Sequence, residues 1–235
     1  MKPVADQDVD RLYRQMREQH GAKKAGANGY RSHKFFLREQ RLLLQHTHGI
    51  DGPILDIACG SGLMLQPLYL SGQTVTGLDF NEDACKDARQ NGMSIIQGDA
   101  FELPFANSTF SAAVNCQFLN QQPAAATQRF VEEACRVLQP GGKLIILWRH
   151  ADSWLHKTAH RILRTLDSIT NAQPEFPQYA NPLSDVAQYA KDADMQLTFS
   201  AVTLPMTPIQ HVAANGAIAG IAGASLFAIF EKSGR

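Results

Sequence analysis

The sequence predicts an α/β fold in which helices alternate with the strands of one central sheet. A short apolar run at residues 53–57 leads through a glycine turn into Leu63, Met64 and Leu68, whose spacing predicts the start of an amphipathic helix. Further short apolar runs alternate with helical patterns along the chain, as repeated strand–helix units do. The chain has 235 residues, which is enough for one such domain with a full core and too few for two large domains and a linker.

The overall charge is balanced. The chain carries 22 basic and 22 acidic residues, and this balance gives no indication of nucleic-acid binding. Between Arg11 and Arg41, however, there are nine Lys or Arg residues and two Glu, a local excess of seven positive charges. This excess fits either a solvated helix face or a basic lid that attracts an anionic substrate or a membrane surface.

Cysteine usage and hydropathy predict a cytoplasmic protein with reduced thiols. The amino terminus has no apolar signal segment, and no C-x-x-C pair occurs among the four cysteines, Cys59, Cys85, Cys116 and Cys135. No Asp, Glu, Lys or Arg lies between Asp194 and Glu231, but polar residues and prolines interrupt this segment. It never reaches the roughly 18 consecutive apolar residues that a membrane span needs, so we expect buried elements there.

Residues 1–48 are expected to form an amino-terminal helical cap. A helix is predicted from about Val4 to His20, followed by a glycine-bounded stretch. A second helix is predicted over Arg31–His46, where Phe35, Phe36, Leu42 and Leu43 recur at helical spacing.

Residues 49–150 are expected to form the core of the sheet. After the first strand, at residues 53–57, the predicted strands are Thr74–Phe80, Ser94–Gln97, Phe110–Phe118 and Lys143–Trp148. The predicted helices between them are Glu82–Gln90 and Ala124–Leu138. The sequence Pro140-Gly141-Gly142 should end the second of these helices, because proline stops a helix and glycine makes the turn.

Residues 151–235 are expected to add substrate-side helices, a lid loop and the last two strands of the same domain. Asn171–Ser184 contains three prolines and is predicted to be an irregular loop. The predicted order of elements after it is a helix at Asp185–Asp192, a strand at Gln196–Leu204, a helix at Thr207–Gly220 and a strand at Ser225–Glu231.

The glycine turn after the first strand predicts a nucleotide or nucleotide-like site. Glycines there let a ligand approach the backbone, and a helix that starts behind the turn would present unpaired N–H groups. A dinucleotide fingerprint needs a third glycine, where this chain has Leu65, and an acidic residue about 20 positions further on, which Asp79 supplies. The first requirement fails, so a nicotinamide cofactor is disfavoured.

Four landmarks occur in order along the chain: Asp56-Ile57-Ala58-Cys59-Gly60-Ser61-Gly62, Gly77-Leu78-Asp79-Phe80, Gln97-Gly98-Asp99-Ala100-Phe101 and Arg136-Val137-Leu138-Gln139-Pro140-Gly141-Gly142. With them the chain resembles the class I S-adenosylmethionine-dependent methyltransferases, and in particular the branch that includes the ubiquinone and menaquinone biosynthesis enzymes. The resemblance covers roughly Ile54 to Trp148. It implies a doubly wound, Rossmann-like, seven-stranded and mostly parallel sheet, with an antiparallel last strand inserted beside the fifth.

The resemblance also implies the cofactor site for S-adenosyl-L-methionine and its product S-adenosyl-L-homocysteine. It assigns Asp79 to the ribose hydroxyls, Asp99 and the Ala100 N–H to the adenine, and a backbone contact to Cys116. Tyr30, from the cap, could reach the methionine end or could serve in ordinary packing. Asp79 and Asp99 could instead cap the helices that follow them. The other residues expected at the cofactor are Asp56, Ala58, Gly60, Gly62 and Phe80.

Candidate acid–base residues lie beyond the resemblance. His150, His156 and His160 fall in a short window, and the last two share a helical face. They are the clustered side chains whose intrinsic pKa suits proton removal from an oxygen or carbon acceptor. Substrate contact or a structural role is also open to them. No Glu completes the H-E-x-x-H zinc pattern, so we expect no metal.

The sequence therefore predicts a methyltransferase that acts on a small-molecule acceptor, without nucleic acid. The basic amino-terminal segment and the apolar carboxyl third favour a lipid-like or quinone-like acceptor. A non-catalytic partner or regulatory protein that binds S-adenosylmethionine stays open as an alternative, because Asn120-Gln121-Gln122 stands where many relatives have histidines or acidic residues. The acceptor, the methylated atom and the oligomeric state are left open by the sequence.

Overall fold

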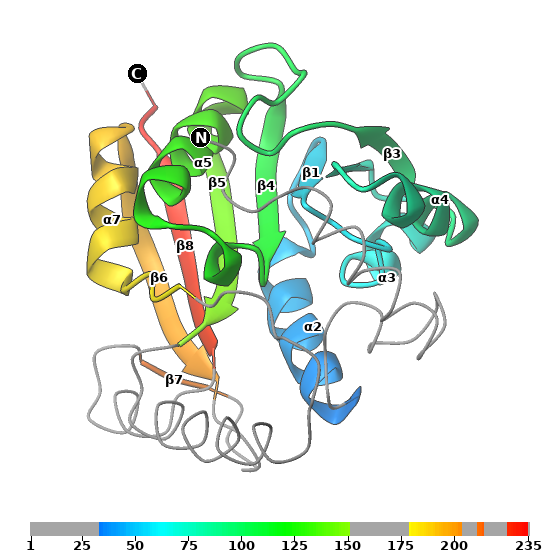
Figure 1. The fold of residues 1–235 in the computed structure, drawn as a ribbon, viewed down its shortest axis with the longest axis horizontal. Helices are drawn as coiled ribbons and strands as arrows, with labels where there is room; N and C mark the ends of the chain where they lie inside the picture. The colour runs from blue at the N-terminus through cyan, green and yellow to red at the C-terminus, as the bar shows by residue number, and fades with distance from the viewer. Residues whose placement is uncertain (1–32, 151–178, 204–210, 214–224, 235) are drawn as a thin grey trace, which may run out of the picture.

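In a computed structural model, the chain forms an eight-stranded sheet with helices on both faces (Figure 1). The structure describes residues 33–150, 179–203, 211–213 and 225–234. The predicted helix at Val4–His20, Tyr30, His156 and His160 lie outside these residues.

The first half of the chain alternates strands and helices as predicted. Its elements are α2 (His33–Thr47), β1 (Ile54–Ile57), α3 (Gln66–Leu70), β2 (Val75–Asp79), α4 (Glu82–Gln90) and β3 (Ser94–Gln97). The second half contains β4 (Phe110–Cys116), η2 (Leu119–Gln121), α5 (Ala124–Val137), β5 (Leu138–Arg149), α7 (Leu183–Asp192), β6 (Met195–Thr203), β7 (His211–Ala213) and β8 (Ser225–Lys232).

The strand order is β3-β2-β1-β4-β5-β8-β6-β7. Strands β1 to β5 pair in parallel, and β8 is antiparallel to both of its neighbours, β5 and β6. The doubly wound, mostly parallel sheet and the antiparallel last strand beside the fifth are confirmed. The eighth strand is β7, which pairs with β6 and extends the seven expected strands at that edge. At β1 the chain turns to β2 on one side, and at β4 it turns to β5 on the other, so the switch point of the sheet lies between β1 and β4.

Apolar side chains cover both faces of the sheet. On one face, Phe130 of α5 and Val186 of α7 pack with Leu55 and Ile57 of β1. On the other face, side chains of α2, α3 and α4 pack with Ile54 and with residues of β4 and β5. This two-sided burial follows from strand geometry, because successive side chains point to opposite faces.

Two predictions about single elements were wrong. The helix after the glycine turn was expected to begin near Leu63, but α3 begins only at Gln66 and has five residues. The strand β7 lies within Thr207–Gly220, where a helix was predicted, and it pairs antiparallel with β6. Short apolar segments of this kind do not separate helix from strand by periodicity.

Pro140-Gly141-Gly142 lies inside β5 instead of forming a separate turn. The pairing of β5 with β4 jumps from Phe110↔Leu138 to Ala112↔Lys143, so the extra residues form an irregularity in the strand. A Cβ atom on Gly142 would lie 2.8 Å from the Gln139 carbonyl oxygen, which explains why a glycine occupies this position.

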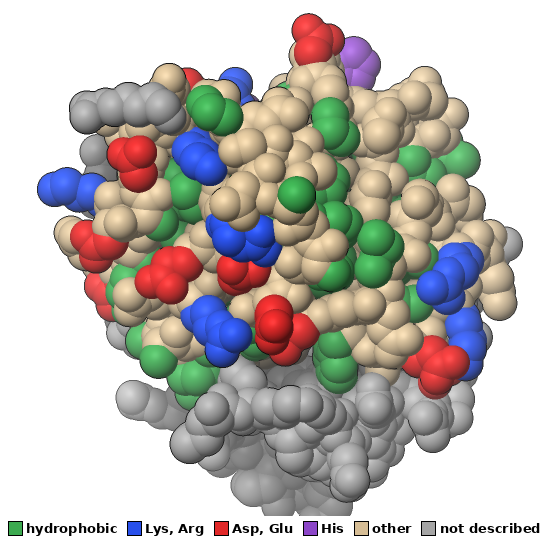
Figure 2. All heavy atoms as spheres, turned by 90° about the horizontal axis from the view of Figure 1, so that it is seen from above, with side chains coloured by type: hydrophobic (Ala, Val, Ile, Leu, Met, Phe, Trp, Pro, Cys, Tyr) green, Lys and Arg blue, Asp and Glu red, His purple; other side chains and the backbone are tan. Residues whose placement is uncertain are grey.

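The surface at the amino ends of β4 and β5 shows acidic and basic side chains interspersed (Figure 2). This face therefore offers no one-sided charge that would attract a polyanion. Within the described ranges, no helix is both long enough and apolar enough to cross a bilayer.

Candidate functional site

The glycine turn after β1 is a left-handed, tightly held segment. Ala58, Gly60 and Gly62 have φ values of 55°, 56° and 74°. Left-handed backbone is strained for alanine, by about 1–2 kcal/mol, and such strain is concentrated at functional sites.

Side chains from α2, α3 and the end of α4 donate hydrogen bonds to backbone carbonyl groups of this turn. The amide of Asn91 donates to the Ser61 carbonyl at 2.8 Å, and the Tyr69 hydroxyl donates to the Gly62 carbonyl at 3.2 Å. The Gln40 amide of α2 donates to the Leu63 carbonyl at 2.8 Å. Because these carbonyls are engaged, the turn holds its shape without the start of a long helix behind it.

Asp79 lies beside this turn at the end of β2. Its Oδ2 accepts a hydrogen bond from the Gly60 N–H at 2.8 Å, and its Oδ1 accepts one from the Asn81 N–H at 2.9 Å. The cap of α4 is Asn81, whose side chain accepts from the Ala84 N–H at 2.7 Å, so the capping interpretation of Asp79 is wrong.

The segment after β3 reaches the same edge of the sheet. The Gly98 N–H donates to the Asp79 carbonyl at 3.0 Å and so joins the end of β2 to the end of β3. Asp99 is exposed, its Oδ1 accepts from the Phe101 N–H at 2.9 Å, and Ala100 is buried. No helix follows Asp99 before β4, so the capping interpretation of this residue is wrong as well.

Phe80 follows Asp79 in the chain, and its large apolar side chain is exposed. The structure thus brings Gly60, Asp79, Phe80 and Asp99 to the carboxyl ends of β1, β2 and β3. Ligands of open parallel sheets bind at this edge.

Asp56 is a buried carboxyl group at the end of β1. It is 1% exposed, and its Oδ2 has no hydrogen-bond partner within the described residues. Burial, reinforced by the negative charge of Asp79, raises the pKa of Asp56 from 3.8 to about 8. A buried carboxyl group without a partner is suited to receive a cationic group.

Cys116 lies at the end of β4, one residue before the left-handed Gln117. Burial raises the pKa of its thiol well above the usual value, and the carboxylates of Asp56 and Glu39 raise it further. The thiolate is therefore disfavoured, which supports a backbone role for this residue and argues against a nucleophile.

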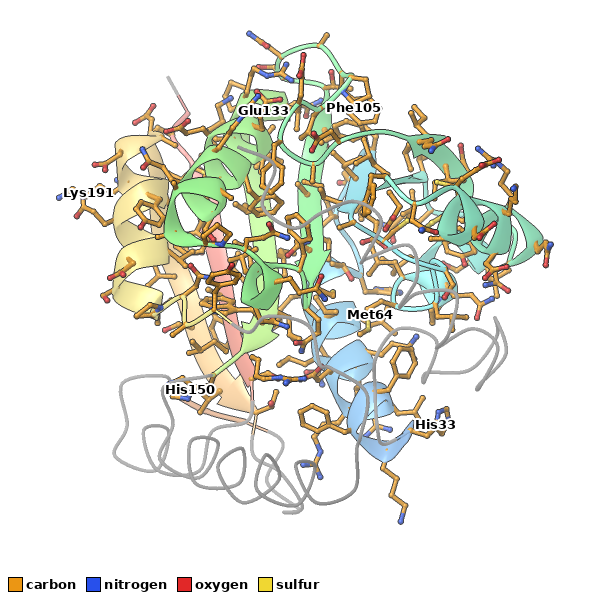
Figure 3. All side chains as sticks on the ribbon, viewed as in Figure 1. His33, Met64, Phe105, Glu133, His150 and Lys191 are labelled. Carbon is orange, nitrogen blue, oxygen red and sulfur yellow. The ribbon has the colours of Figure 1, made fainter. Side chains whose placement is uncertain are left out.

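Of the three candidate acid–base histidines, His150 is the one that lies within the described residues. It is half-buried and follows β5 at the edge where β4 and β5 end, whereas Phe105 and Glu133 lie at the opposite edge (Figure 3). The Arg149 N–H donates to the Asn120 Oδ1 at 3.2 Å, so Asn120 helps to hold this strand end. Across the ranges that the structure describes, no group of three His, Cys, Asp or Glu side chains could hold a metal ion.

Sequence reasoning missed Glu39 and Gln40 of α2. Glu39 is fully buried and accepts a hydrogen bond from the Gln117 amide at 3.1 Å. The signal was present, because Glu39 is the one acidic residue of α2 and lies at helical spacing from Phe36 and Leu43. An acidic residue in an apolar stripe indicates a specific partner.

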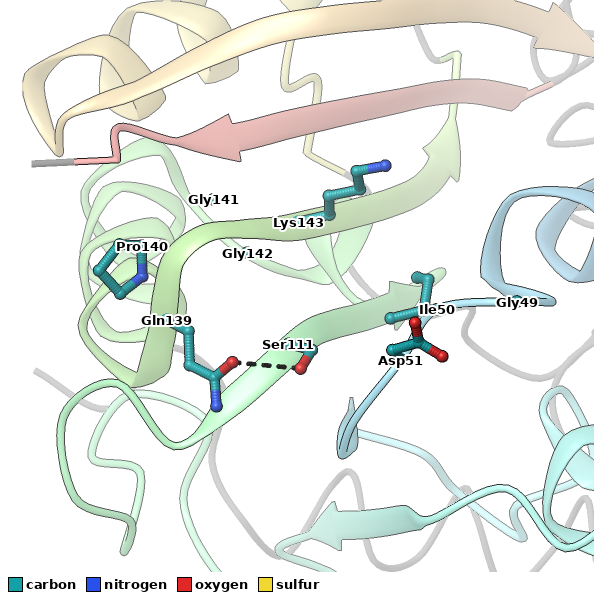
Figure 4. A pocket seen from close by; sticks show the side chains of 9 residues that line it. All are labelled: Gly49, Ile50, Asp51, Ser111, Gln139, Pro140, Gly141, Gly142 and Lys143. Atoms are coloured by element: carbon teal, nitrogen blue, oxygen red, sulfur yellow. Dashed lines mark hydrogen bonds between the residues drawn. The ribbon is translucent and has the colours of Figure 1, made fainter.

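A hollow of about 360 Å³ lies at the opposite edge, at the amino ends of β4 and β5 (Figure 4). It is lined by Gly49, Ile50, Asp51, Ser111 and residues 139–143, and the Ser111 hydroxyl donates to Gln139 Oε1 at 3.2 Å. None of the residues expected at the cofactor lines it, so it is separate from the candidate site.

Comparison with known proteins decides the family. The family described as a methyltransferase domain matches residues 55–146. A phosphatidylethanolamine N-methyltransferase from Cereibacter sphaeroides is 32% identical over 177 residues, which cover 72% of this chain and 81% of that enzyme. The chain belongs to the class I S-adenosylmethionine-dependent methyltransferases.

A demethylmenaquinone methyltransferase from Corynebacterium kroppenstedtii is 36% identical over 94 residues, 40% of each chain. The chain thus spans well under two thirds of the length of this methyltransferase relative. The fold is also similar to that of a methyltransferase from Thermotoga maritima, described as a possible histamine N-methyltransferase. The TM-score is 0.68 at 17% identity, with 96% of this chain and 98% of the other covered.

The residues at the carboxyl edge fit the cofactor of this methyltransferase family. S-adenosylmethionine carries a sulfonium and an ammonium group, and the buried Asp56 Oδ2 lacks a partner in the described part of the chain. The Asp79 carboxylate offers acceptors for two hydroxyl groups. The positive φ angles at Gly60 and Gly62 give the turn a left-handed backbone that glycine adopts without strain.

Proposed function

We propose that this methyltransferase transfers a methyl group from S-adenosyl-L-methionine to a small lipid-like or quinone-like acceptor. The observation that carries the proposal is the position of Asp79, which accepts a hydrogen bond from the Gly60 N–H at the carboxyl ends of β1 and β2, close to the buried carboxyl group of Asp56. The two relatives support the acceptor class, because one is named for a phospholipid and the other for a quinone.

The cofactor, when bound, supplies an electrophilic methyl group, so the chain has to bind, align and exclude water. We assign Asp79 to the ribose, Asp99 and Ala100 to the adenine, and Asp56 to the cationic end. His150, His156 and His160 are assigned to proton removal from an oxygen or carbon acceptor. An amine acceptor of the phosphatidylethanolamine type could enter the site as the free base, so its methylation would need no proton removal by a histidine beforehand.

The experiment combines the purified protein with methyl-labelled S-adenosylmethionine and a host extract separated into organic-soluble and aqueous fractions. Label in the organic fraction supports the proposal, and vesicles with phosphatidylethanolamine or a demethylated quinone then separate the two acceptors. Label in the aqueous fraction would contradict the lipid-like acceptor and indicate that the acceptor is a polar metabolite. Absence of transfer, together with tight binding of S-adenosylhomocysteine, would favour the non-catalytic alternative.

The control is Asp79→Asn, which removes the charge and replaces one of the two oxygens that accept the Gly60 and Asn81 N–H groups. It should lower the transfer of label at limiting cofactor concentration and recover activity when the cofactor is raised. This pattern would link the transferred label to the proposed cofactor site.

A further inference from the structure

Helix α2 contacts both sides of the switch point through two adjacent residues. Gln40 donates to the carbonyl oxygens of Leu63 and Met64, at 2.8 and 3.3 Å, in the segment after β1. Glu39 accepts a hydrogen bond from Gln117, directly after β4. Because β1 and β4 are neighbouring strands, α2 joins the two chain segments between which ligands of this fold bind.

Gln117 has an unusual backbone conformation for its residue type. Its φ is 61°, in the left-handed region that glycine usually occupies. Its N–H donates to the Leu147 carbonyl at 2.7 Å, and its side-chain amide donates to Glu39 at 3.1 Å and to the Ser225 hydroxyl at 3.4 Å. Contacts with α2, β5 and β8 therefore hold a strained residue in place at a strand end.

Stability alone does not account for Glu39. A fully buried carboxylate is expensive to desolvate, and an apolar residue at the same place on the α2 stripe would pack against Phe36 and Leu43 at lower cost. A glycine at position 117 would adopt the observed φ without strain, but it would remove the amide that donates to Glu39. The chain thus keeps a strained residue together with this hydrogen bond, and such strain is concentrated at functional sites.

We propose that Glu39 is a positioning residue for methyl transfer, because its hydrogen bond with Gln117 fixes the backbone of residues 116–117 where cofactor and acceptor meet. The inference rests on the proposed function, and it adds a residue from the amino-terminal cap to that site. Gln40 acts in the same arrangement by fixing the segment after β1.

The test measures binding of S-adenosylhomocysteine by calorimetry and thermal unfolding for Glu39→Ala, Glu39→Gln and Gln117→Gly. Glu39→Ala and Gln117→Gly should each weaken binding by about tenfold, since each removes a hydrogen bond to a charged group. Glu39→Gln keeps an acceptor oxygen and should stay within about threefold of the wild type. Gln117→Gly should change the unfolding temperature by about 5 °C or less, because relief of the left-handed strain offsets part of the cost of losing the bonds to Glu39 and Ser225.

The control is Gln45→Ala, an exposed position on the same helix, which should change neither quantity. The double variant Glu39→Ala/Gln117→Gly should bind about as weakly as either single variant, because both remove the same bond. Wild-type affinity in Gln117→Gly, or changes in unfolding temperature alone, would overturn the inference while leaving the proposed function intact. Absence of binding by the wild-type protein would overturn both.

Discussion

The N–H of Gly60 donates a hydrogen bond of 2.8 Å to Oδ2 of Asp79, across 19 residues of sequence. The glycine turn and the acidic residue at the end of β2 are therefore positioned by each other before any ligand binds. The two carboxylate oxygens of Asp79 accept the N–H groups of Gly60 and Asn81. Asp79 therefore holds the glycine turn as well as being proposed to accept the ribose hydroxyls.

Asp56 should make the stability of the ligand-free protein fall as the pH rises. Its pKa is about 8 in the folded protein against 3.8 for the unperturbed group, so between these values the folded state holds a proton that the unfolded state has lost. Stability contributed by that protonated form is present below about pH 4 and is lost as the pH approaches 8. Asp56→Asn, which does not titrate, should gain up to about 4 kcal/mol relative to the wild type between pH 5 and 8.5. Urea unfolding at the two pH values measures this gain, and a constant difference would contradict the assignment.

Gly62→Ala should destabilise the protein more than Gly72→Ala does. Both glycines have positive φ, 74° and 90°, so alanine is strained at either position. A Cβ on Gly62 would lie 2.9 Å from Met93 Sδ, whereas nothing lies within 4 Å of one on Gly72. We expect about 1–2 kcal/mol of strain in both variants and about 1 kcal/mol more in Gly62→Ala from crowding. Equal midpoints in denaturant would show that Met93 moves aside freely.

Among the polar side chains of the segment before α7, Asn181 should contribute most to the free energy of unfolding. Its amide donates to the carbonyls of Leu119 and Gln122, at 2.7 and 3.0 Å, and its Oδ1 accepts from the Thr127 hydroxyl at 3.1 Å. Asn181→Ala should lower the free energy of unfolding by about 2–3 kcal/mol, because buried partners lose their bonds. Gln188→Ala, which removes an exposed bond to Asp192, should change it by less than about 0.5 kcal/mol. Similar losses in the two variants would rule out the buried network as the source.

Glu133 should stabilise the loop before β4 at neutral pH and lose this effect in acid. Its carboxylate accepts from Arg136 and from the Leu103 N–H, and the Arg136 guanidinium lowers its pKa below the usual 4.5. A lowered carboxyl pKa contributes stability above the unfolded value, and this is lost as the pH falls through the folded value. Glu133→Gln should cost about 0.5–1 kcal/mol at pH 7, since solvent reaches the pair, and less at about pH 3.5. A loss that is the same at both pH values would point to packing instead of charge.

The sequence predicted the elements whose patterns are local. The bounds of β3 and α4 match the prediction, because each is a short periodic run closed by turn residues. The place of β8 beside β5 came only from family resemblance. Six buried residues in a row, from Ser225 to Phe230, show no alternation that could indicate strand direction.

The candidate site was predictable where residue type and position in a motif coincide, as at Gly60, Asp79 and Asp99. Glu39 and Gln117 were not, since their contact joins positions 78 residues apart and depends on how α2 crosses the sheet. The raised pKa of Asp56 likewise depends on burial, which a single carboxyl residue at a strand end does not reveal.

The most direct test of the central claim is a calorimetric titration of S-adenosylhomocysteine into the wild-type protein and into Asp79→Asn. The structure predicts saturable binding at one site in the wild type, weakened in the variant by about 1–3 kcal/mol, or roughly 5- to 150-fold, through loss of charge-assisted hydrogen bonds. Absence of binding to the wild type, or equal affinity in the two proteins, would contradict the assignment of this edge of the sheet to the cofactor.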